Sequence, residues 1–350
     1  MAARAIMLLL ISVVAAGCGP ERQPLANPLQ VGRVLYVSNG AHRTEFRTIQ
    51  AAVNAADPKI EGWTQILVLP GIYDETVVIG PDKARIILTG HNRAGTVLMR
   101  SKLANEDGPP HGEIPLTVRG RDILIRNIRL WNAARPEGTR HETALKLAGD
   151  RIIVQNVEIK GNRDALVAEG PGRVFITLST IEGQHDLASA GGGVITLTTL
   201  RALDVPKEGG YMLHAGRAQR SWLPAPLGQA ATAPDSAGQA ATTQPAAPCP
   251  LIVRNCVFTG DAEASRLTAL DLADAAVVYA VSNNFESGIG VKIAAASLAG
   301  NAALLPFDNR AGKDKLQWPA TPPGRIVQPQ QKTLQEMLNW DAEAIMRAFD

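Results

Sequence analysis

Short apolar runs rich in β-branched residues recur from residue 114 onward, and this feature limits the fold more than any other. The runs occupy 123–132, 151–162, 173–184, 193–204, 251–261 and 276–288. Most of them end in a polar or glycine-containing turn, and no segment between 120 and 205 has the apolar spacing of an amphipathic helix. The chain is therefore predicted to be all-β and built from many short strands.

Two architectures use many short strands: the β-sandwich, and the solenoid, in which repeats of about 20 to 30 residues stack on one another. The turns between these runs lack the Asn-Gly pairs of tight hairpins, which favours the solenoid. Asparagine also recurs just after the middle of the runs, at Asn127, Asn156, Asn255 and Asn283, which indicates in-register stacking. We predict a parallel β-helix.

A solenoid needs caps, because its two end coils would otherwise expose open strand edges. Residues 48–56 predict a short N-terminal capping helix. At the other end, Thr333 and Glu336 form a capping box at the start of 333–349, where apolar residues recur on one face. We predict a C-terminal capping helix within 326–350; the alternative is a helix that lies on a membrane surface.

The N-terminus predicts export. Arg4 precedes an apolar run over 6–14 that is too short to span a bilayer. Small residues then precede Cys18, as in a bacterial lipobox, so we expect a signal peptide over 1–18 and lipidation of Cys18; an ordinary secretory signal is the alternative. We expect the cell envelope or the secreted space, and specifically a membrane-anchored bacterial lipoprotein.

The remaining chain is predicted to form one domain. Residues 19–30 are a polar tether, and 31–325 form the β-helix, with a disordered insertion at 224–248 that is rich in Ala, Pro, Gln and Thr. Cys256 is expected in the core and Cys249 in a loop, because the extended segment between them is too long for a disulfide. The net charge of +2 gives no basic footprint for nucleic acid. We expect a monomer that meets the membrane only through its lipid anchor.

Two aspartates close similar polar clusters, Gly-Asn-Arg-Asp at 161–164 and Gly-Gln-His-Asp at 183–186. Asp164 and Asp186 are 22 residues apart, and so are the matching Ile159 and Ile181. If one coil takes that length, the two carboxylates lie about 4–6 Å apart on neighbouring coils, on a face open to solvent. Such a pair offers one proton donor and one nucleophile. The alternative is that both are ordinary turn residues.

The stretch ALKLAGDRIIVQNVEIKGNRDAL (144–166), with 181–203 and 210–217, resembles the pectin methylesterase (pectinesterase) family. The similarity extends over about 34–217, and its opening part is shared with other β-helix proteins. The resemblance implies a right-handed parallel β-helix, with Asp186 as nucleophile and Asp164 as general acid/base. The implied reaction is hydrolysis of a galacturonate methyl ester through an acyl-enzyme, with no cofactor or metal.

The chain departs from the family around these aspartates. The family has glutamines, which help to hold the oxyanion, where this chain has Arg163 and His141; both replacements are also donors. Arg163 beside Asp164 is expected to lower the pKa of that acid and to oppose its role. The family's Arg-x-Trp motif has no clear match near 269–271, although Arg266 lies close by in sequence.

The sequence thus predicts a pectinesterase-like carboxylic ester hydrolase that acts on methyl-esterified cell-wall polysaccharide, with low or altered activity. The alternative is a non-catalytic carbohydrate-binding β-helix on a surface lipoprotein. A third possibility is a β-helix lyase or glycosidase. A lyase usually needs an acidic calcium-binding cluster, which the sequence does not show; two carboxylates about 5 Å apart would suit a retaining glycosidase, but the sequence similarity favours the esterase.

Overall fold

A computed structural model describes residues 30–40, 42–101, 113–134, 142–169, 172–184, 186–207, 209–215, 251–261, 264, 267–272, 277–286, 303–307, 310–311 and 341–349. The predicted leader with Cys18, the insertion at 224–248 and the first part of the predicted C-terminal helix lie outside these residues. His141, Cys249 and Arg266 lie outside them too, so the predictions about them remain untested.

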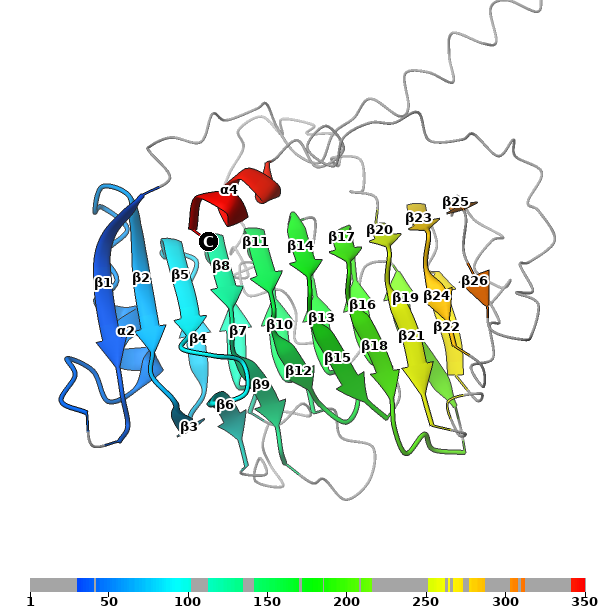
Figure 1. Cartoon of the computed structure of the whole chain (residues 1–350), viewed down its shortest axis with the longest axis horizontal. Helices are drawn as coiled ribbons and strands as arrows, with labels where there is room; N and C mark the ends of the chain where they lie inside the picture. The colour runs from blue at the N-terminus through cyan, green and yellow to red at the C-terminus, as the bar shows by residue number, and fades with distance from the viewer. Residues whose placement is uncertain are drawn as a thin grey trace, which may run out of the picture.

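The described chain winds through three parallel sheets in turn, so that each complete coil adds one strand to each sheet (Figure 1). The predicted parallel β-helix is therefore confirmed. The first sheet has ten strands, in the order β1 (Val31–Val37), β2 (Trp63–Val68), β5 (Ala84–Gly90), β8 (Arg121–Arg126), β11 (Asp150–Gln155), β14 (Val174–Thr177), β17 (Gly193–Thr196), β20 (Leu251–Arg254), β23 (Val277–Val281) and β25 (Ala303–Phe307).

The other two sheets complete the coils. The nine-stranded sheet contains β3 (Gly71–Asp74), β6 (Thr96–Arg100), β9 (Arg129–Asn132), β12 (Glu158–Lys160), β15 (Thr180–Gly183), β18 (Thr199–Ala202), β21 (Val257–Gly260), β24 (Asn284–Phe285) and β26 (Arg310–Ala311). The seven-stranded sheet contains β4 (Val77–Ile79), β7 (Leu116–Val118), β10 (Leu145–Leu147), β13 (Leu166–Ala168), β16 (Ala188–Ala190), β19 (Gly210–Ala215) and β22 (Leu267–Leu272).

Neighbouring coils stack in register. Ile159 pairs with Ile181, and in the seven-stranded sheet Leu166 pairs with Ala188, each 22 residues further on. The inward-facing positions form one continuous core in which aliphatic side chains lie directly above one another. Each such side chain contributes about 1.5–3 kcal/mol when it leaves water, so this column is the main source of stability.

The corner between the ten-stranded and nine-stranded sheets, which we call the asparagine corner, repeats a left-handed backbone conformation. Its members have positive φ and are Asn127, Asn156, Leu178, Leu197, Asn255 and Ser282. Asparagine adopts this conformation more readily than most residues. The Asn156 amide also donates to the Asn127 side-chain oxygen at 2.8 Å. Three of the four predicted stacking asparagines therefore belong to this corner.

The fourth asparagine, Asn283, lies one position further along and is buried. Its side chain accepts a hydrogen bond from the backbone N–H of Cys256 at 2.9 Å and donates one to the Val253 carbonyl at 3.0 Å. Cys256 is itself buried in the core with a free thiol, as predicted, and burial raises the pKa of that thiol to about 12.

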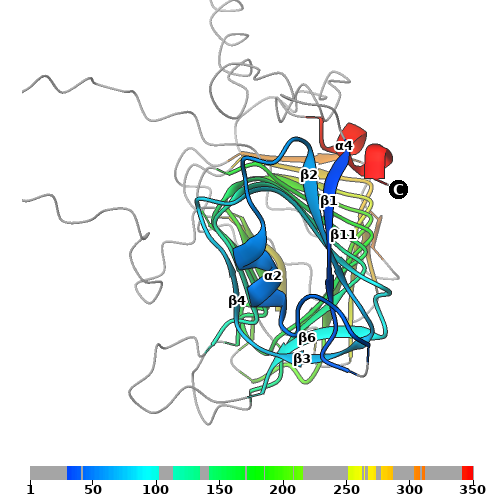
Figure 2. The same cartoon turned by 90° about the vertical axis from the view of Figure 1, so that its left-hand side faces the viewer.

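Helix α2 (Ile49–Ala55) covers the N-terminal end of the coil, as the end-on view makes plain (Figure 2). Its Thr48 cap accepts a hydrogen bond from the Ala51 N–H at 3.2 Å. The Glu75 carboxylate accepts from the N–H groups of Ile49 and Gln50 at 2.7 and 3.0 Å, so a neighbouring coil satisfies the first turn. The predicted N-terminal cap is confirmed.

Helix α4 (Ala342–Phe349) differs in position from the predicted C-terminal cap. It lies on the outer face of the ten-stranded sheet over its earlier strands rather than on the last coil (Figure 1). Its Ile345 is buried with Ile87, Leu124 and other outward-facing apolar residues of that sheet. The apolar outer face of the ten-stranded sheet and the open end of the last coil could each bind the helix, and the outer face binds it. Neither described helix is long and apolar enough to cross a bilayer.

Candidate active site

Asp164 and Asp186 lie at the corner where the chain passes from the nine-stranded to the seven-stranded sheet, just before β13 and β16. We call this the aspartate corner. Both residues have left-handed backbone conformations, with φ of 54° and 51°. The Asp164 N–H donates to the Asp186 carbonyl at 2.8 Å. The prediction that one coil separates the two aspartates is therefore confirmed.

Both aspartates are buried, with 0% of Asp164 and 4% of Asp186 exposed. The left-handed backbone is one that turn aspartates adopt, but the exposure typical of ordinary turn residues is absent. The two carboxyl groups are therefore less open to solvent than expected, although Arg163 beside them is 28% exposed. A buried carboxylate is costly unless a donor or a cation accompanies it.

Arg163 supplies the cation. Its Nη2 and Nε atoms lie 3.1 and 3.3 Å from Oδ2 of Asp186, and its side chain is 28% exposed. The Tyr211 N–H donates to the other oxygen, Oδ1, at 3.2 Å. The guanidinium thus binds the aspartate of the next coil, whereas the sequence placed it on its own neighbour, Asp164. These contacts favour the ionised form of Asp186.

A row of outward-facing side chains continues from this corner along the seven-stranded sheet. Residues Leu145 and Leu147 point into the core, so Lys146 between them points outward. Val167, Ser189 and His214 follow Lys146 in register on the later coils. The ring of Tyr211 lies 5.2 Å from that of His214.

Sequence analysis missed one ionisable residue of this corner, Glu142. It is 5% exposed, and its N–H donates to the Arg163 carbonyl at 3.2 Å. Burial raises the pKa of its carboxyl to about 8, although a hydrogen bond with the Asn162 side chain acts in the opposite direction. The available signal was an acidic residue directly before a buried run, Thr143 to Leu145.

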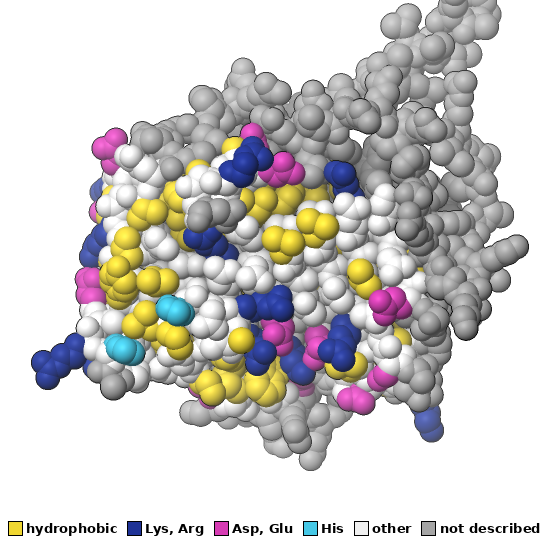
Figure 3. Space-filling view, in the orientation of Figure 1, with side chains coloured by type: hydrophobic (Ala, Val, Ile, Leu, Met, Phe, Trp, Pro, Cys, Tyr) yellow, Lys and Arg dark blue, Asp and Glu magenta, His cyan; other side chains and the backbone are white. Residues whose placement is uncertain are grey.

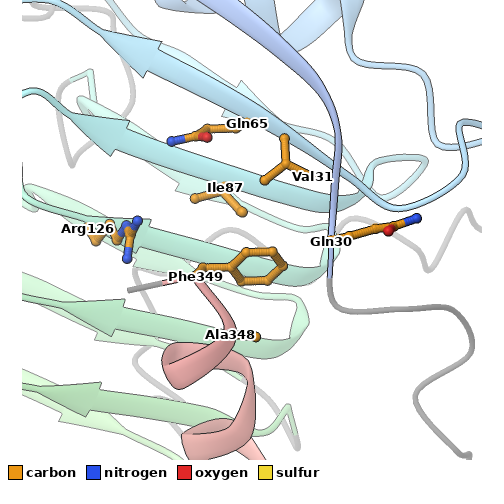
Figure 4. Close-up of a pocket in the computed structure, with 7 residues that line it drawn as sticks. All are labelled: Gln30, Val31, Gln65, Ile87, Arg126, Ala348 and Phe349. Carbon is orange, nitrogen blue, oxygen red and sulfur yellow. The ribbon is translucent and has the colours of Figure 1, made fainter.

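Two other surface features lie apart from the aspartates. A cavity of about 270 Å³ opens between α4 and the ten-stranded sheet, lined by Gln30, Val31, Gln65, Ile87, Arg126, Ala348 and Phe349 (Figure 4). The nine-stranded sheet carries mixed charges on its outer face (Figure 3). These charges form the ion pairs Arg129–Glu158, Lys160–Glu182 and Arg201–Glu182.

The fold and the corner together define a parallel β-helix protein with two stacked, buried aspartates, one of which is bound by an arginine. Comparison with known proteins agrees: the family model described as Pectinesterase matches residues 36–202, which include both aspartates. Residues 36–202 thus resemble the pectinesterase family.

Individual relatives are distant. The chain is 25% identical to the pectinesterase of Petunia integrifolia over 151 residues, which cover 43% of this chain and 40% of the relative. The curated relatives are matched over a fifth to two fifths of their own length.

Solved structures extend the similarity of fold. Pectin methylesterase PemA from Erwinia chrysanthemi superimposes with a TM-score of 0.63 at 16% identity, over 87% of this chain and 96% of that one. A pectin methylesterase in complex with a hexasaccharide gives 0.63 at 15% identity, over 87% and 96% of the two chains. At this identity the superposition establishes the fold alone.

Proposed function

We propose that this protein is a pectin methylesterase-type carboxylic ester hydrolase that acts on methyl-esterified cell-wall polysaccharide. The observation that carries the proposal is the Arg163 guanidinium on Asp186, within a stacked pair that belongs to the family-matched region. A carboxylate that attacks an ester must be ionised and held in place, and Arg163 with the Tyr211 N–H does both.

In the proposed first half-reaction, an Asp186 oxygen attacks the ester carbonyl carbon of a galacturonate residue, and the carbonyl electron pair moves to the oxygen. The tetrahedral intermediate then expels methoxide, which takes a proton from Asp164 and leaves as methanol. What remains is an anhydride between Asp186 and the sugar carboxyl. Asp164, now a carboxylate, is the base for the second half.

In the second half-reaction, Asp164 accepts a proton from water as the water oxygen attacks the sugar acyl carbon. Collapse frees the Asp186 carboxylate and the galacturonic acid product, and Asp164 is protonated again. The two guanidinium hydrogen bonds of Arg163 both go to Asp186, so we assign Arg163 the role of holding the nucleophile in place. Arg163 and His141 also remain our predicted oxyanion donors, with His141 outside the described residues.

The substrate class rests on the family region and on the neighbouring fold, since a similar pectin methylesterase is known in complex with a hexasaccharide. Lys146 and His214 are partly exposed and lie on the same sheet, with the buried Val167 and Ser189 on the coils between them, and such stacking of equivalent positions over successive coils suits an extended polymer. Because the residues around Asp164 and Asp186 differ from the family pattern, we expect ester hydrolysis to be slower than in typical members of the family.

The test is methanol release from methyl-esterified pectin by the mature protein and by Asp186→Ala, with demethylated pectin as the substrate control. We expect release by the unchanged protein and none above background by the variant. Polysaccharide binding is measured on the same two proteins. Binding by both with methanol from neither would overturn the esterase and favour the non-catalytic carbohydrate-binding protein.

A further inference from the structure

Glu142 contacts three consecutive residues of the turn that carries Arg163 and Asp164. Its N–H donates to the Arg163 carbonyl at 3.2 Å, and its side chain hydrogen-bonds that of Asn162. Its own carbonyl approaches Gly161 so closely that a Cβ there would collide with it. Gly161 is bound from the other side, where its N–H donates to the Glu182 carbonyl at 3.1 Å. Glu142 therefore fixes this turn from the preceding coil.

The side chain of Glu142 is almost fully enclosed, and its Oε1 has no hydrogen-bond partner among the described residues. An ionised oxygen in that position would lack the donors that a buried charge needs, whereas the protonated acid needs fewer. Among the described residues, Lys160, Arg163, Asp164, Glu182 and Asp186 are the charged residues in or next to this turn, and Glu113 and Lys146 lie on the segments that adjoin Glu142 and Thr143. Burial is the main cause of the raised pKa, about 8.

We propose that Glu142 is a positioning residue of the aspartate corner: as a neutral acid bonded to Asn162, it fixes the turn from which Arg163 reaches Asp186. Ionisation of Glu142 would bring a negative charge and its hydration into the turn. The guanidinium would then be held less firmly, because its backbone is bound to Glu142. The consequence for catalysis rests on the proposed esterase function; the consequence for Arg163 does not.

The first experiment follows the guanidinium ¹³Cζ resonance of Arg163 between pH 6 and 9 in arginine-labelled protein, assigned by its loss in Arg163→Lys. We expect a titration with a midpoint near the Glu142 pKa of about 8 in the unchanged protein. Glu142→Gln, which mimics the neutral acid, should show no such titration. Glu158→Gln, which loses only the ion pair with Arg129, should behave like the unchanged protein.

The second experiment measures kcat/KM for methanol release over the same pH range. The unchanged protein should lose activity above the pKa, by up to about tenfold per pH unit, while Glu142→Gln stays flat. Glu142→Ala should be impaired at every pH, and Gln should rescue it at pH 7.

The outcomes separate the two proposals. An Arg163 resonance that titrates identically in the unchanged protein and in Glu142→Gln would overturn the positioning role, and so would a Gln variant as impaired as Ala. Absence of methanol release by the unchanged protein would instead refute the esterase, and the Arg163 titration would still decide the role of Glu142.

Discussion

The asparagine corner and the aspartate corner solve the same backbone problem with different side chains. Both stack left-handed residues one coil apart: Asn127 and Asn156 in one, Asp164 and Asp186 in the other. In the asparagine corner a neutral amide donates to its neighbour at 2.8 Å. In the aspartate corner two carboxyl groups are stacked and buried, and Arg163 binds one of them.

This difference indicates which corner has a task beyond folding. Asparagine adopts the left-handed turn as well as aspartate does and needs no counter-charge when buried. A chain that required only the turn would lose nothing by having asparagine at both positions. The buried carboxylates and their arginine are a cost that the fold does not require, which is typical of a functional site.

Exchanging aspartate and asparagine between the two corners tests this comparison most directly. Asp186→Asn keeps the left-handed turn but removes the nucleophile, so methanol release should fall by about a thousandfold or more. The melting temperature should change little. The reverse exchange, Asn156→Asp in the asparagine corner, should leave activity unchanged. Full activity in Asp186→Asn would mean that both corners are structural.

Removing the counter-charge has the next largest effect. Arg163→Gln should lower kcat/KM by about a hundredfold, the usual scale for one lost electrostatic contact in an active site. Asp186 would lose its cation while Asp164 remains adjacent, so the pKa of Asp186 should rise. The acidic limb of the pH profile should then move to higher pH. Arg129→Gln, which removes a surface ion pair, is the control. An unmoved acidic limb would contradict the assignment of Arg163.

In the asparagine corner the largest effect is expected at the buried Asn283. Asn283→Ala leaves the Cys256 N–H and the Val253 carbonyl without their partner, which costs about 1–3 kcal/mol in the free energy of unfolding. Urea denaturation measures this loss, and activity of the remaining folded protein should be normal. A loss as small as that of the exposed Asn255→Ala would contradict the structural importance of Asn283.

The smallest expected effect is a gain. Leu178 has the same left-handed conformation but is 50% exposed, so its side chain contributes little burial. Leu178→Asn should stabilise the protein by about 0.5–1 kcal/mol, because asparagine pays less for positive φ. The midpoint of urea denaturation should rise, whereas Leu178→Val should lower it. Equal midpoints for Asn and Val would show that the backbone conformation does not limit stability here.

Spacing in the sequence was enough to predict the coil and the stacked aspartates, because equal intervals between Ile159 and Ile181 and between Asp164 and Asp186 report the length of one turn. The partner of Arg163 could not be predicted in this way. A left-handed residue follows Arg163 directly, and the direction of its long side chain depends on that local geometry. Glu142 was missed because burial depends on how neighbouring coils cover it.

The position of α4 was missed for a different reason. The sequence predicted its apolar face, but several strands of the ten-stranded sheet contain consecutive apolar residues, such as Ile123, Leu124 and Ile125. Since side chains in a strand alternate between its two faces, such runs indicate an outer face that also needs cover. The apolar outer face and the open end of the solenoid are therefore two possible binding sites for the helix, and the sequence alone does not show which of them binds it.

The attachment of α4 has a consequence for how the molecule comes apart. Coils of a solenoid contact only their neighbours, so such chains unravel from an end. Here the ring of Phe349 lies 5.2 Å from that of Trp63, and Ala348 shares a cavity with Val31 at the start of β1. The last turn of α4 is thus attached to β1 and β2. Local unfolding of the first coil must therefore also release α4. Removal of α4 by proteolysis would in turn expose the outer face of β1 and β2.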